Sequence, residues 1–300
     1  MIEMRRPFSL GPVVLAATLA MAGCGDDPFD DEYPPNLFGV GYAEGAFVAV
    51  GENYSIANSA NGYDFYEQAW DGEGSLQSVG FGKNTWVTCG EDGIIATSTD
   101  TANWFLQYLP TDQTLRGVAF GNNAYVIVGD HGVLFRSTNA GAWFFEVPGT
   151  EADLEDVVFG ANRFVAVGEG GTILTSPDGI DWTQRDSGTP TDLLGVGYGE
   201  GRFVAVGLSG TVVTSEDAIV WTPRATPTGE NLRDVAIAEG VIVTVGGDGM
   251  ILTSEDGESF VEQFSGTGHV LESVTHGEGV FVVVGRGTTI LNSDDGVYWY

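Results

Sequence analysis

The sequence predicts an all-β fold, a seven-bladed β-propeller with four-stranded blades, and three observations lead to it. The chain repeats itself every 39 residues, seven times and without an insertion. Each unit contains short runs rich in Val, Ile and Thr separated by turn residues, which is typical of β-strands. No segment has the 3.6-residue period of a helix. Units of about 40 residues with four strands each are typical of propeller blades.

Four columns of the repeat keep one residue type in all seven units. The leucine column gives the expected start of each blade: Leu37, Leu76, Leu115, Leu154, Leu193, Leu232 and Leu271. The valine column that starts at Val40, the glycine column from Gly51 and the serine column from Ser59 recur at the same 39-residue step. Because no column slips, the repeat describes the whole chain from residue 37 to residue 300.

Each unit reads as four short strands. The first begins at the repeated leucine, and the turn after it ends in Gly or Asn in every unit, as expected where a hairpin needs positive φ. An aromatic or apolar residue such as Phe164 leads the second strand, and a short turn leads to the third, exemplified by residues 172–176. The fourth strand begins at an aromatic residue in every unit, for example Trp182.

Residues 28–300 make up the predicted propeller, a span of seven times 39 residues. The seventh blade lacks most of its fourth strand, because the sequence stops just after Trp299. Residues 28–36 stand at the phase of the repeat that would supply this strand. We therefore expect the N-terminal segment to complete the last blade and close the ring. Its prolines are compatible with an outer edge strand.

Residues 1–23 resemble a lipoprotein signal peptide. Two arginines form a positive start, and the apolar stretch after them is too short to span a bilayer. The stretch ends in Met-Ala-Gly before Cys24, which resembles a bacterial lipobox with Met in place of the usual leucine. The resemblance implies cleavage before Cys24, lipid attachment to this cysteine and a short tether at 24–27. A plain secretory signal with an unrelated cysteine is the alternative.

The lipobox resemblance implies an exported protein of the bacterial cell envelope, held to a membrane by lipid. Gly25, and not an aspartate, follows the cysteine, which favours the outer membrane over the inner one by the retention rule of enteric bacteria. The run Arg-Arg-Pro-Phe at positions 5–8 is also similar to a twin-arginine signal. The ordinary secretory route and the twin-arginine route therefore both stay open.

The chain is strongly acidic, with a formal net charge of −31 at pH 7. Removal of residues 1–23 leaves 9 basic and 41 acidic residues, or −32. Such a field repels nucleic acid and anionic headgroups and favours cations or basic partners. A soluble, self-repelling surface with no dedicated partner is the simpler explanation of the same charge.

Each unit also carries a Ser-x-Asp or Ser-x-Asn turn shortly before its aromatic residue. The stretch 176–182, Ser-Pro-Asp-Gly-Ile-Asp-Trp, resembles the Asp-box of the sialidase-like repeat superfamily, with one residue fewer between Ser and Trp. The whole unit is similar to the photosystem II assembly-factor-like repeats of exported bacterial proteins. The resemblance implies a propeller and leaves the function open.

The acidic residue of this motif is interpreted as a turn device, because its carboxylate can accept hydrogen bonds from backbone N–H groups two residues on. Seven identical sites around the rim argue against a catalytic role. The residues given this structural role are Asp100, Asp178, Asp217, Asp256 and Asp295, with Trp104, Trp143, Trp182, Trp221 and Trp299 as the aromatic partners.

A ligand would be recognised where the repeat varies most in chemistry. One such ring is the position after the repeated leucine, and the other is the loop between the second and third strands. Both belong to the face that propellers commonly use for binding. The candidate residues are Arg116, Glu155, Arg233 and Glu272 on the first ring and Glu91, Asp92, Asp130, His131, Asp248 and Arg286 on the second.

The leading hypothesis is a monomeric, non-enzymatic interaction or assembly module that presents an acidic face to a protein or peptide partner of basic character. The rival is a sialidase-like glycoside hydrolase or a glycan-binding propeller. That chemistry needs three arginines on one substrate carboxylate, and Arg116, Arg233 and Arg286 are the only ones expected on this face. Glu155 and Glu272 could then serve as acid and base. No residue is assigned a catalytic role.

No cofactor is expected from the sequence. Turns that contain Asp92, Asp130 and Asp248 offer oxygen ligands of the kind that Ca²⁺ prefers, but too few of them for a complete site, so Ca²⁺ stays an open alternative to plain turn chemistry. Cys89 replaces a valine of its column and is expected to be a small buried apolar residue. No glycine-rich nucleotide motif occurs in a strand–helix context.

Overall fold

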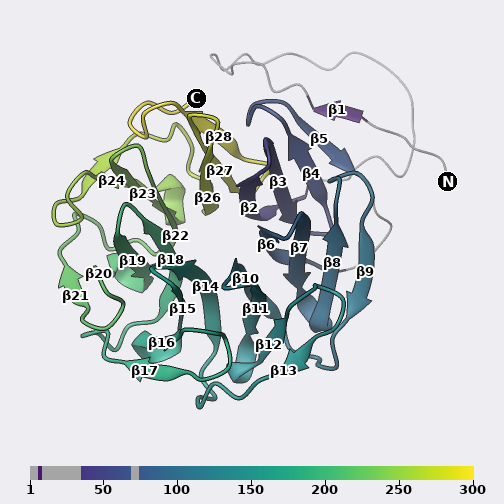
Figure 1. Ribbon diagram of the computed structural model, residues 1–300. Helices are drawn as coiled ribbons and strands as arrows, with labels where there is room; N and C mark the ends of the chain where they lie inside the picture. Colours follow the sequence, from purple (N-terminus) through teal and green to yellow (C-terminus); the bar gives the residue numbers. More distant parts are fainter. Residues whose placement is uncertain (1–5, 9–34, 69–73) are drawn as a thin grey trace.

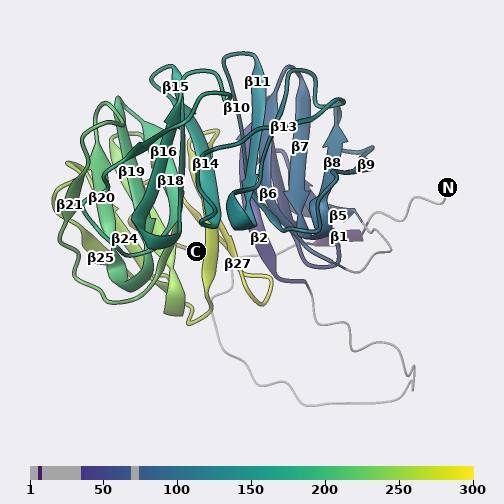
Figure 2. The ribbon, with the colours of Figure 1, turned by 90° about the horizontal axis from the view of Figure 1, so that it is seen from below.

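The computed structural model describes residues 6–8, 35–68 and 74–300, and it confirms the predicted seven-bladed β-propeller. Seven antiparallel sheets surround a central axis (Figure 1). Within the described residues five sheets have four strands, the first has five and the seventh has three. Seen from the side in Figure 2, the strands run between the two faces of the ring. No helix long and apolar enough to cross a membrane occurs in this part of the chain.

The innermost strand of each blade is the first one in sequence. In the first four blades the strands are β2 (Leu37–Ala43), β3 (Ala46–Gly51), β4 (Ile56–Ser59) and β5 (Phe65–Gln68); β6 (Leu76–Gly82), β7 (Thr85–Gly90), β8 (Ile94–Ser98) and β9 (Phe105–Tyr108); β10 (Leu115–Gly121), β11 (Ala124–Gly129), β12 (Leu134–Ser137) and β13 (Phe144–Phe145); β14 (Leu154–Gly160), β15 (Arg163–Gly168), β16 (Thr172–Ser176) and β17 (Thr183–Arg185).

The last three blades repeat the pattern. They contain β18 (Leu193–Gly199), β19 (Arg202–Gly207), β20 (Val212–Ser215) and β21 (Thr222–Arg224); β22 (Leu232–Ala238), β23 (Val241–Gly246), β24 (Ile251–Ser254) and β25 (Val261–Gln263); β26 (Leu271–Gly277), β27 (Val280–Gly285) and β28 (Ile290–Ser293). Single 3-10 turns join the second and third strands of blades 2 to 6: η1 (Glu91–Gly93), η2 (Asp130–Gly132), η3 (Glu169–Gly171), η4 (Leu208–Gly210) and η5 (Gly247–Gly249).

Every innermost strand contains a β-bulge directly after its repeated leucine. In blade 3, Leu115 pairs with Gly129 and Gly117 with Val128, so the residue between them has no partner in the ladder. The same shift occurs in the other six blades. A bulge re-aims the extra side chain and bends the strand. The position after the repeated leucine is therefore set apart from the sheet in all seven blades.

The hairpin between the first two strands of each blade explains the Gly and Asn column. Both turn residues have positive φ, for example 44° at Lys83 and 56° at Asn84. This left-handed conformation is accessible to Gly and tolerated by Asn, whereas other side chains adopt it at a cost. The prediction of a positive-φ hairpin at this point is confirmed.

The hydrophobic core lies between neighbouring blades. Each cluster of buried residues draws on two adjacent sheets, as where Val165 of blade 4 packs with Phe203 and Val213 of blade 5. Trp221 belongs to that cluster and is 6% exposed, so the aromatic residue that follows the Ser-x-Asp turn fills space between two blades. A blade buries its faces only against its neighbours, which is why a closed ring is stable where one blade would not be.

The first and last blades meet and close the ring. Phe47 of blade 1 packs with Val282 of blade 7 in one buried cluster. The rings of Tyr63 and Tyr300 stack with centroids 6.2 Å apart. Asn292 and Tyr300 exchange backbone hydrogen bonds of 2.9 and 3.2 Å, which begins a fourth strand on blade 7.

The segment expected to complete that strand falls mainly on residues 28–34, outside the described residues. Of that segment the structure describes only Pro35 and Asn36, and Asn36 accepts a hydrogen bond from the backbone N–H of Gly287 in blade 7. Cys24 and most of the predicted signal peptide also lie outside the described residues. Of residues 1–23 the structure describes only β1 (Arg6–Phe8), which pairs antiparallel with β5 of the first blade.

Candidate binding face

The bulge residues of all seven blades line one cavity at the centre of the ring. The cavity has a volume of about 400 Å³, and its lining includes Phe38, Gln77, Arg116, Glu155, Leu194, Arg233 and Glu272. The sequence predicted that this position forms a ring at the channel rim, where the repeat varies most in chemistry. The bulge gives the physical reason for that variation, because a residue outside the ladder is free of the requirements of sheet pairing.

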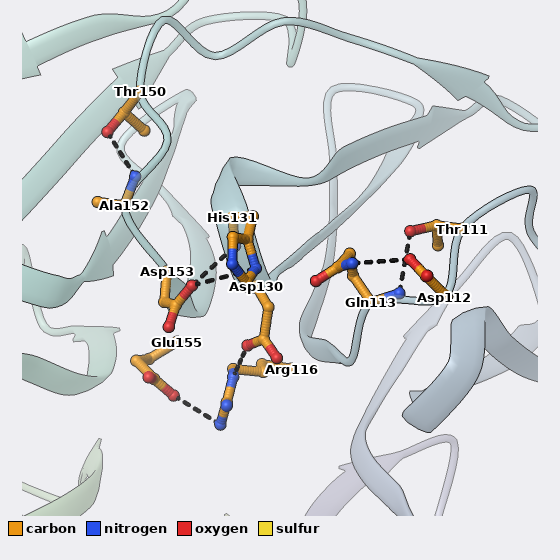
Figure 3. Close-up of polar contacts among 10 residues, drawn as sticks. All are labelled: Thr111, Asp112, Gln113, Arg116, Asp130, His131, Thr150, Ala152, Asp153 and Glu155. Atoms are coloured by element: carbon orange, nitrogen blue, oxygen red, sulfur yellow. Dashed lines mark hydrogen bonds and ion pairs between the residues drawn. The ribbon is translucent and has the colours of Figure 1, made fainter.

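Arg116 is held by carboxylates from two blades. Its Nε donates a hydrogen bond to Asp130 of the same blade, and its terminal nitrogen lies 3.1 Å from Glu155 of the next (Figure 3). Burial opposes the charge of Arg116, but the bond to Asp130 and the nearby carboxylates outweigh it and raise the pKa of the guanidinium. Burial also raises the pKa of Glu155, with Arg116 acting in the opposite direction. The positive charge of Arg116 is therefore already compensated within the protein.

A second ion-pair group joins blades 6 and 7. Glu272 forms an ion pair with Arg233 at 3.1 Å and accepts a hydrogen bond from Arg286 at 2.8 Å, one arginine on each carboxylate oxygen. The Glu272 side chain is only 8% exposed, whereas that of Arg286 is 52% exposed. Two charge-assisted contacts of this kind fix the carboxylate in place.

The three arginines of the sialidase hypothesis are thus divided between two groups. Arg116 binds acids of blades 3 and 4, whereas Arg233 and Arg286 share Glu272 at blades 6 and 7. Arg116 and Arg233 line the central cavity, but Arg286 is not part of its lining. Because each guanidinium is paired with a carboxylate, the arrangement offers no set of free arginines to a substrate carboxylate. The geometry argues against the sialidase hypothesis.

Two aspartates that the sequence analysis did not select lie one position further into the channel. Asp156 and Asp234 occupy a column that otherwise contains only Gly and Ser: Gly39, Ser78, Gly117, Gly195 and Ser273. Both line the cavity. The only signal in the sequence was a carboxylate at two places in a column of small residues.

These aspartates connect neighbouring innermost strands. Asp156 accepts hydrogen bonds from Val157 of its own blade at 2.7 Å and from Val196 of the next blade at 2.9 Å. Asp234 likewise accepts from Val235 at 2.7 Å and Val274 at 2.9 Å. These four donors are backbone N–H groups. Each carboxylate therefore joins the innermost strands of two neighbouring blades.

The serine of the same column extends this pattern to the closure of the ring. Ser273 donates to Asp234 at 2.7 Å, and its oxygen accepts from the Val40 backbone N–H of blade 1 at 3.3 Å. Where the column has glycine, the strands approach too closely for a side chain. A Cβ added at Gly117 would lie 2.9 Å from the Cα of Asp156. The column is thus a set of inter-blade contacts.

Burial dominates the electrostatics of the channel aspartates. It raises the pKa of both Asp156 and Asp234, and the charge of Asp234 raises the pKa of Asp156 further. The backbone N–H groups act in the opposite direction on both carboxyls but do not outweigh burial. A carboxyl in this environment resists ionisation more than an exposed one.

The outer loops of this face contain the remaining candidates. Asp92, His131 and Asp248 adopt left-handed φ of 52°, 54° and 51° at the tips of their turns. All three are exposed, and Glu91 is half-buried beside Asp92. The backbone N–H of His131 donates to Asp153 of the next blade at 2.7 Å, so this loop is also attached to its neighbour (Figure 3).

The loop carboxylates are not arranged as a metal centre in the described part of the chain. Among the residues at 6–8, 35–68 and 74–300, no group of three or more His, Cys, Asp or Glu side chains is placed to hold a metal ion. Cys89 is fully buried, and burial raises the pKa of its thiol, so it packs as a small apolar residue.

Comparison with solved structures shows the same architecture at low sequence identity. "YCF48 bound to D1 peptide" superposes with a TM-score of 0.70 at 18% identity, covering 87% of this chain and 94% of that one. YCF48 from Cyanidioschyzon merolae superposes with a TM-score of 0.70 at 18% identity, covering 87% of this chain and 96% of that one. The WD40 β-propeller domain of Doa1 superposes with a TM-score of 0.71 at 12% identity, covering 89% of this chain and 97% of that one. These similarities establish the fold alone.

Comparisons at the sequence level give no family. No protein-family model matches the chain, and no curated protein matches it. The Asp-box similarity therefore remains a resemblance between motifs.

Proposed function

We propose that this protein is a non-enzymatic binding module, held to a bacterial membrane by lipid on Cys24, that takes a basic segment of a protein or peptide at its channel face. The observation that carries the proposal is the ring of seven bulge residues around the central cavity. These side chains differ in chemistry around the ring while the scaffold repeats. A surface built in this way can recognise a partner without any change in the fold.

The charge of the face supports a basic partner. The ion pairs of the ring balance in charge, because Arg116, Arg233 and Arg286 face the carboxylates of Asp130, Glu155 and Glu272. The acidity of this face lies on its loops, where Asp92 and Asp248 are exposed. Complementary charge increases the rate of encounter and selects against partners of the same sign. A segment rich in Lys or Arg fits these conditions.

The structural neighbours support a protein or peptide as the class of partner. One of the similar structures is YCF48 bound to a D1 peptide. The WD40 domain of Doa1 has the same architecture on a sequence only 12% identical. Since a propeller fold supports many functions, this support is by analogy of fold.

The binding test uses the full chain purified in detergent and two labelled peptides, one of alternating Arg and Gly and one of alternating Glu and Gly. We expect fluorescence anisotropy to show binding of the Arg peptide only, with affinity falling as NaCl is added. The triple variant Glu91→Gln, Asp92→Asn, Asp248→Asn should weaken binding by about tenfold or more, as loss of several rim charges implies.

A matched control removes the same number of acids from the opposite face. Glu44, Glu216 and Glu239 are exposed on turns at the other end of the blades. Their change to Gln should leave the affinity for the Arg peptide nearly unchanged. Equal weakening by both triple variants would show attraction by net charge alone and would overturn the assignment of the face.

The lipid anchor has a separate test. Cells that express the full chain are supplied with radiolabelled palmitate, and the protein is isolated from the envelope. We expect label in the parent chain and none in Cys24→Ser. Label that persists in Cys24→Ser, or its absence from both proteins, would contradict attachment at this cysteine.

A further inference from the structure

The outer strands of blades 2 and 3 carry large apolar side chains that face solvent. On and directly after β9 and β13 these are Phe105, Leu106, Tyr108, Phe144, Phe145 and Val147, each between 42% and 75% exposed. We name these six residues the outer apolar patch. Strands β9 and β13 lie at the rim of two neighbouring blades (Figure 1). An exposed apolar group of this size on a chain with net charge −31 requires a partner to explain it.

The patch is not a requirement of the fold. The residues at the same phase of blades 4 and 5 are polar or small: Thr183 and Thr222 stand where the patch has Phe, and Asp186 and Ala225 where it has Tyr and Val. Those blades form the same four-stranded sheets. The apolar side chains of blades 2 and 3 are therefore dispensable for building a blade.

The patch is also poor in charge. Residues 104–111 contain no charged residue, and residues 143–150 contain one, Glu146. An anionic membrane surface repels most of this protein. It can be approached closely only by a region without acidic residues, because unscreened repulsion acts within a Debye length of about 8 Å at physiological salt.

We propose that the outer apolar patch rests on the lipid bilayer and fixes the orientation of the propeller, an inference that depends on the lipid anchor proposed above. The chain that follows Cys24 enters the described fold at Pro35, which lines one small cavity with Phe65 of blade 1 and Ile290 of blade 7. Blade 1 lies directly beside blade 2. The ten residues from 25 to 34 span at most about 35 Å.

This short reach keeps the propeller at the membrane surface, so that part of its surface lies close to the lipid. Phe, Leu and Tyr are the residues that enter the interface between headgroups and acyl chains. With the patch on the bilayer, the axis of the ring lies along the membrane. The channel face is then open to partners from the side.

A protein partner that adds a strand is disfavoured by the local geometry. Strand β13 is two residues long and β9 is four. A strand added across the patch would therefore find a pairing edge only at β9. The patch presents side chains and not a long free edge, which suits a fluid lipid surface.

The test places an environment-sensitive fluorophore on single cysteines of the full lipidated chain. Cys89 is fully buried and its thiol pKa is raised, so it does not react, and the lipid occupies Cys24. NBD is attached to Phe144→Cys and, in a second protein, to Phe105→Cys. The control is Thr183→Cys at the matching position of blade 4, which is also exposed.

Each labelled protein is reconstituted into vesicles of phosphatidylcholine with a minor fraction of phosphatidylglycerol. We expect blue-shifted emission and quenching by brominated lipid at positions 144 and 105, and a water-like, unquenched spectrum at 183. Flotation with the vesicles reports on the anchor independently of the fluorophore. Vesicle-bound protein with the same water-like spectrum at all three positions would overturn the proposal for the patch while the anchor stands.

Two other outcomes would also overturn it. Protein that does not float with the vesicles would remove the anchor and the inference that depends on it. Blue-shifted emission at position 144 before vesicles are added, together with cross-linking between copies of the chain, would assign the patch to self-association instead.

Discussion

Two sets of aspartates in this propeller accept the same kinds of hydrogen bond, but their pKa values are shifted in opposite directions. Asp256, on a Ser-x-Asp turn at the outer rim, accepts hydrogen bonds from two backbone N–H groups and one serine hydroxyl. Asp234, in the channel, also accepts two backbone N–H groups and one serine hydroxyl. Backbone N–H groups lower the pKa of Asp256 to about 2, whereas burial raises the pKa of Asp234.

The difference shows that burial, and not the set of hydrogen-bond donors, decides the direction in which the pKa of each aspartate shifts. Water solvates the rim carboxylate, so the N–H groups add to a favourable environment. The channel carboxylate has lost that solvation, and three hydrogen bonds do not replace it. The two sets also differ in reach, since Asp256 binds its own turn while Asp234 joins two blades. The channel set is therefore the one on which the ring depends.

The sharpest test of this comparison is the truncation of one aspartate from each set. In Asp234→Ala, the N–H groups of Val235 and Val274 lose their acceptor inside the channel, which should cost about 2–4 kcal/mol in the free energy of unfolding. In Asp178→Ala, the freed N–H groups of the turn are exposed and bind water, so a loss of about 1 kcal/mol is expected. Urea denaturation at pH 7 measures both. Equal losses would refute the distinction between the channel and the rim.

The pH dependence of stability provides a test with a defined sign. A carboxyl whose pKa is raised in the folded state binds more protons folded than unfolded, so its contribution to stability falls as the pH rises from about 4 towards 8. A carboxyl whose pKa is lowered, as in Asp178, contributes stability above the unfolded pKa and loses it only as the pH falls towards its folded pKa.

Substitution by asparagine separates these two contributions. Asp156→Asn should flatten the decline in unfolding free energy between about pH 5 and pH 8, because it removes a group that resists ionisation in the channel. Asp178→Asn should leave the slope in that range unchanged. Urea denaturation in a series of buffers supplies the comparison. An Asp156→Asn slope as steep as that of the parent protein would contradict a raised pKa at Asp156.

The repeat made the fold predictable, because Leu, Val, Gly and Ser columns at a constant 39-residue step specify both the number of blades and their register. The ring of candidate residues was also predicted, as the position after the repeated leucine. The bulge that separates this position from the sheet was not, since nothing in the one-dimensional pattern distinguishes a paired residue from an unpaired one.

Contacts between blades account for most of what the sequence did not reveal. Asp156 and Val196 are 40 residues apart, and they meet only because the ring brings two innermost strands together. The sharing of Glu272 by Arg233 and Arg286 depends on the same geometry. The repeat predicts the strands within each blade, but it does not indicate which atoms of two neighbouring blades come into contact.

The ion pairs of the bulge residues are expected to show the smallest effect in this comparison. The Arg116 side chain is 34% exposed and its partner Glu155 is 21% exposed, so solvent screens their attraction. Glu155→Gln should lower the free energy of unfolding by less than about 1 kcal/mol, and by less still at high NaCl. Urea denaturation at low and high NaCl measures this, with Asp234→Ala as the reference. A loss as large as that of Asp234→Ala would place Glu155 among the residues that hold the ring together. A small loss means that bulge residues can change their chemistry without destabilising the blades, which is the property that a surface selected for its partner requires.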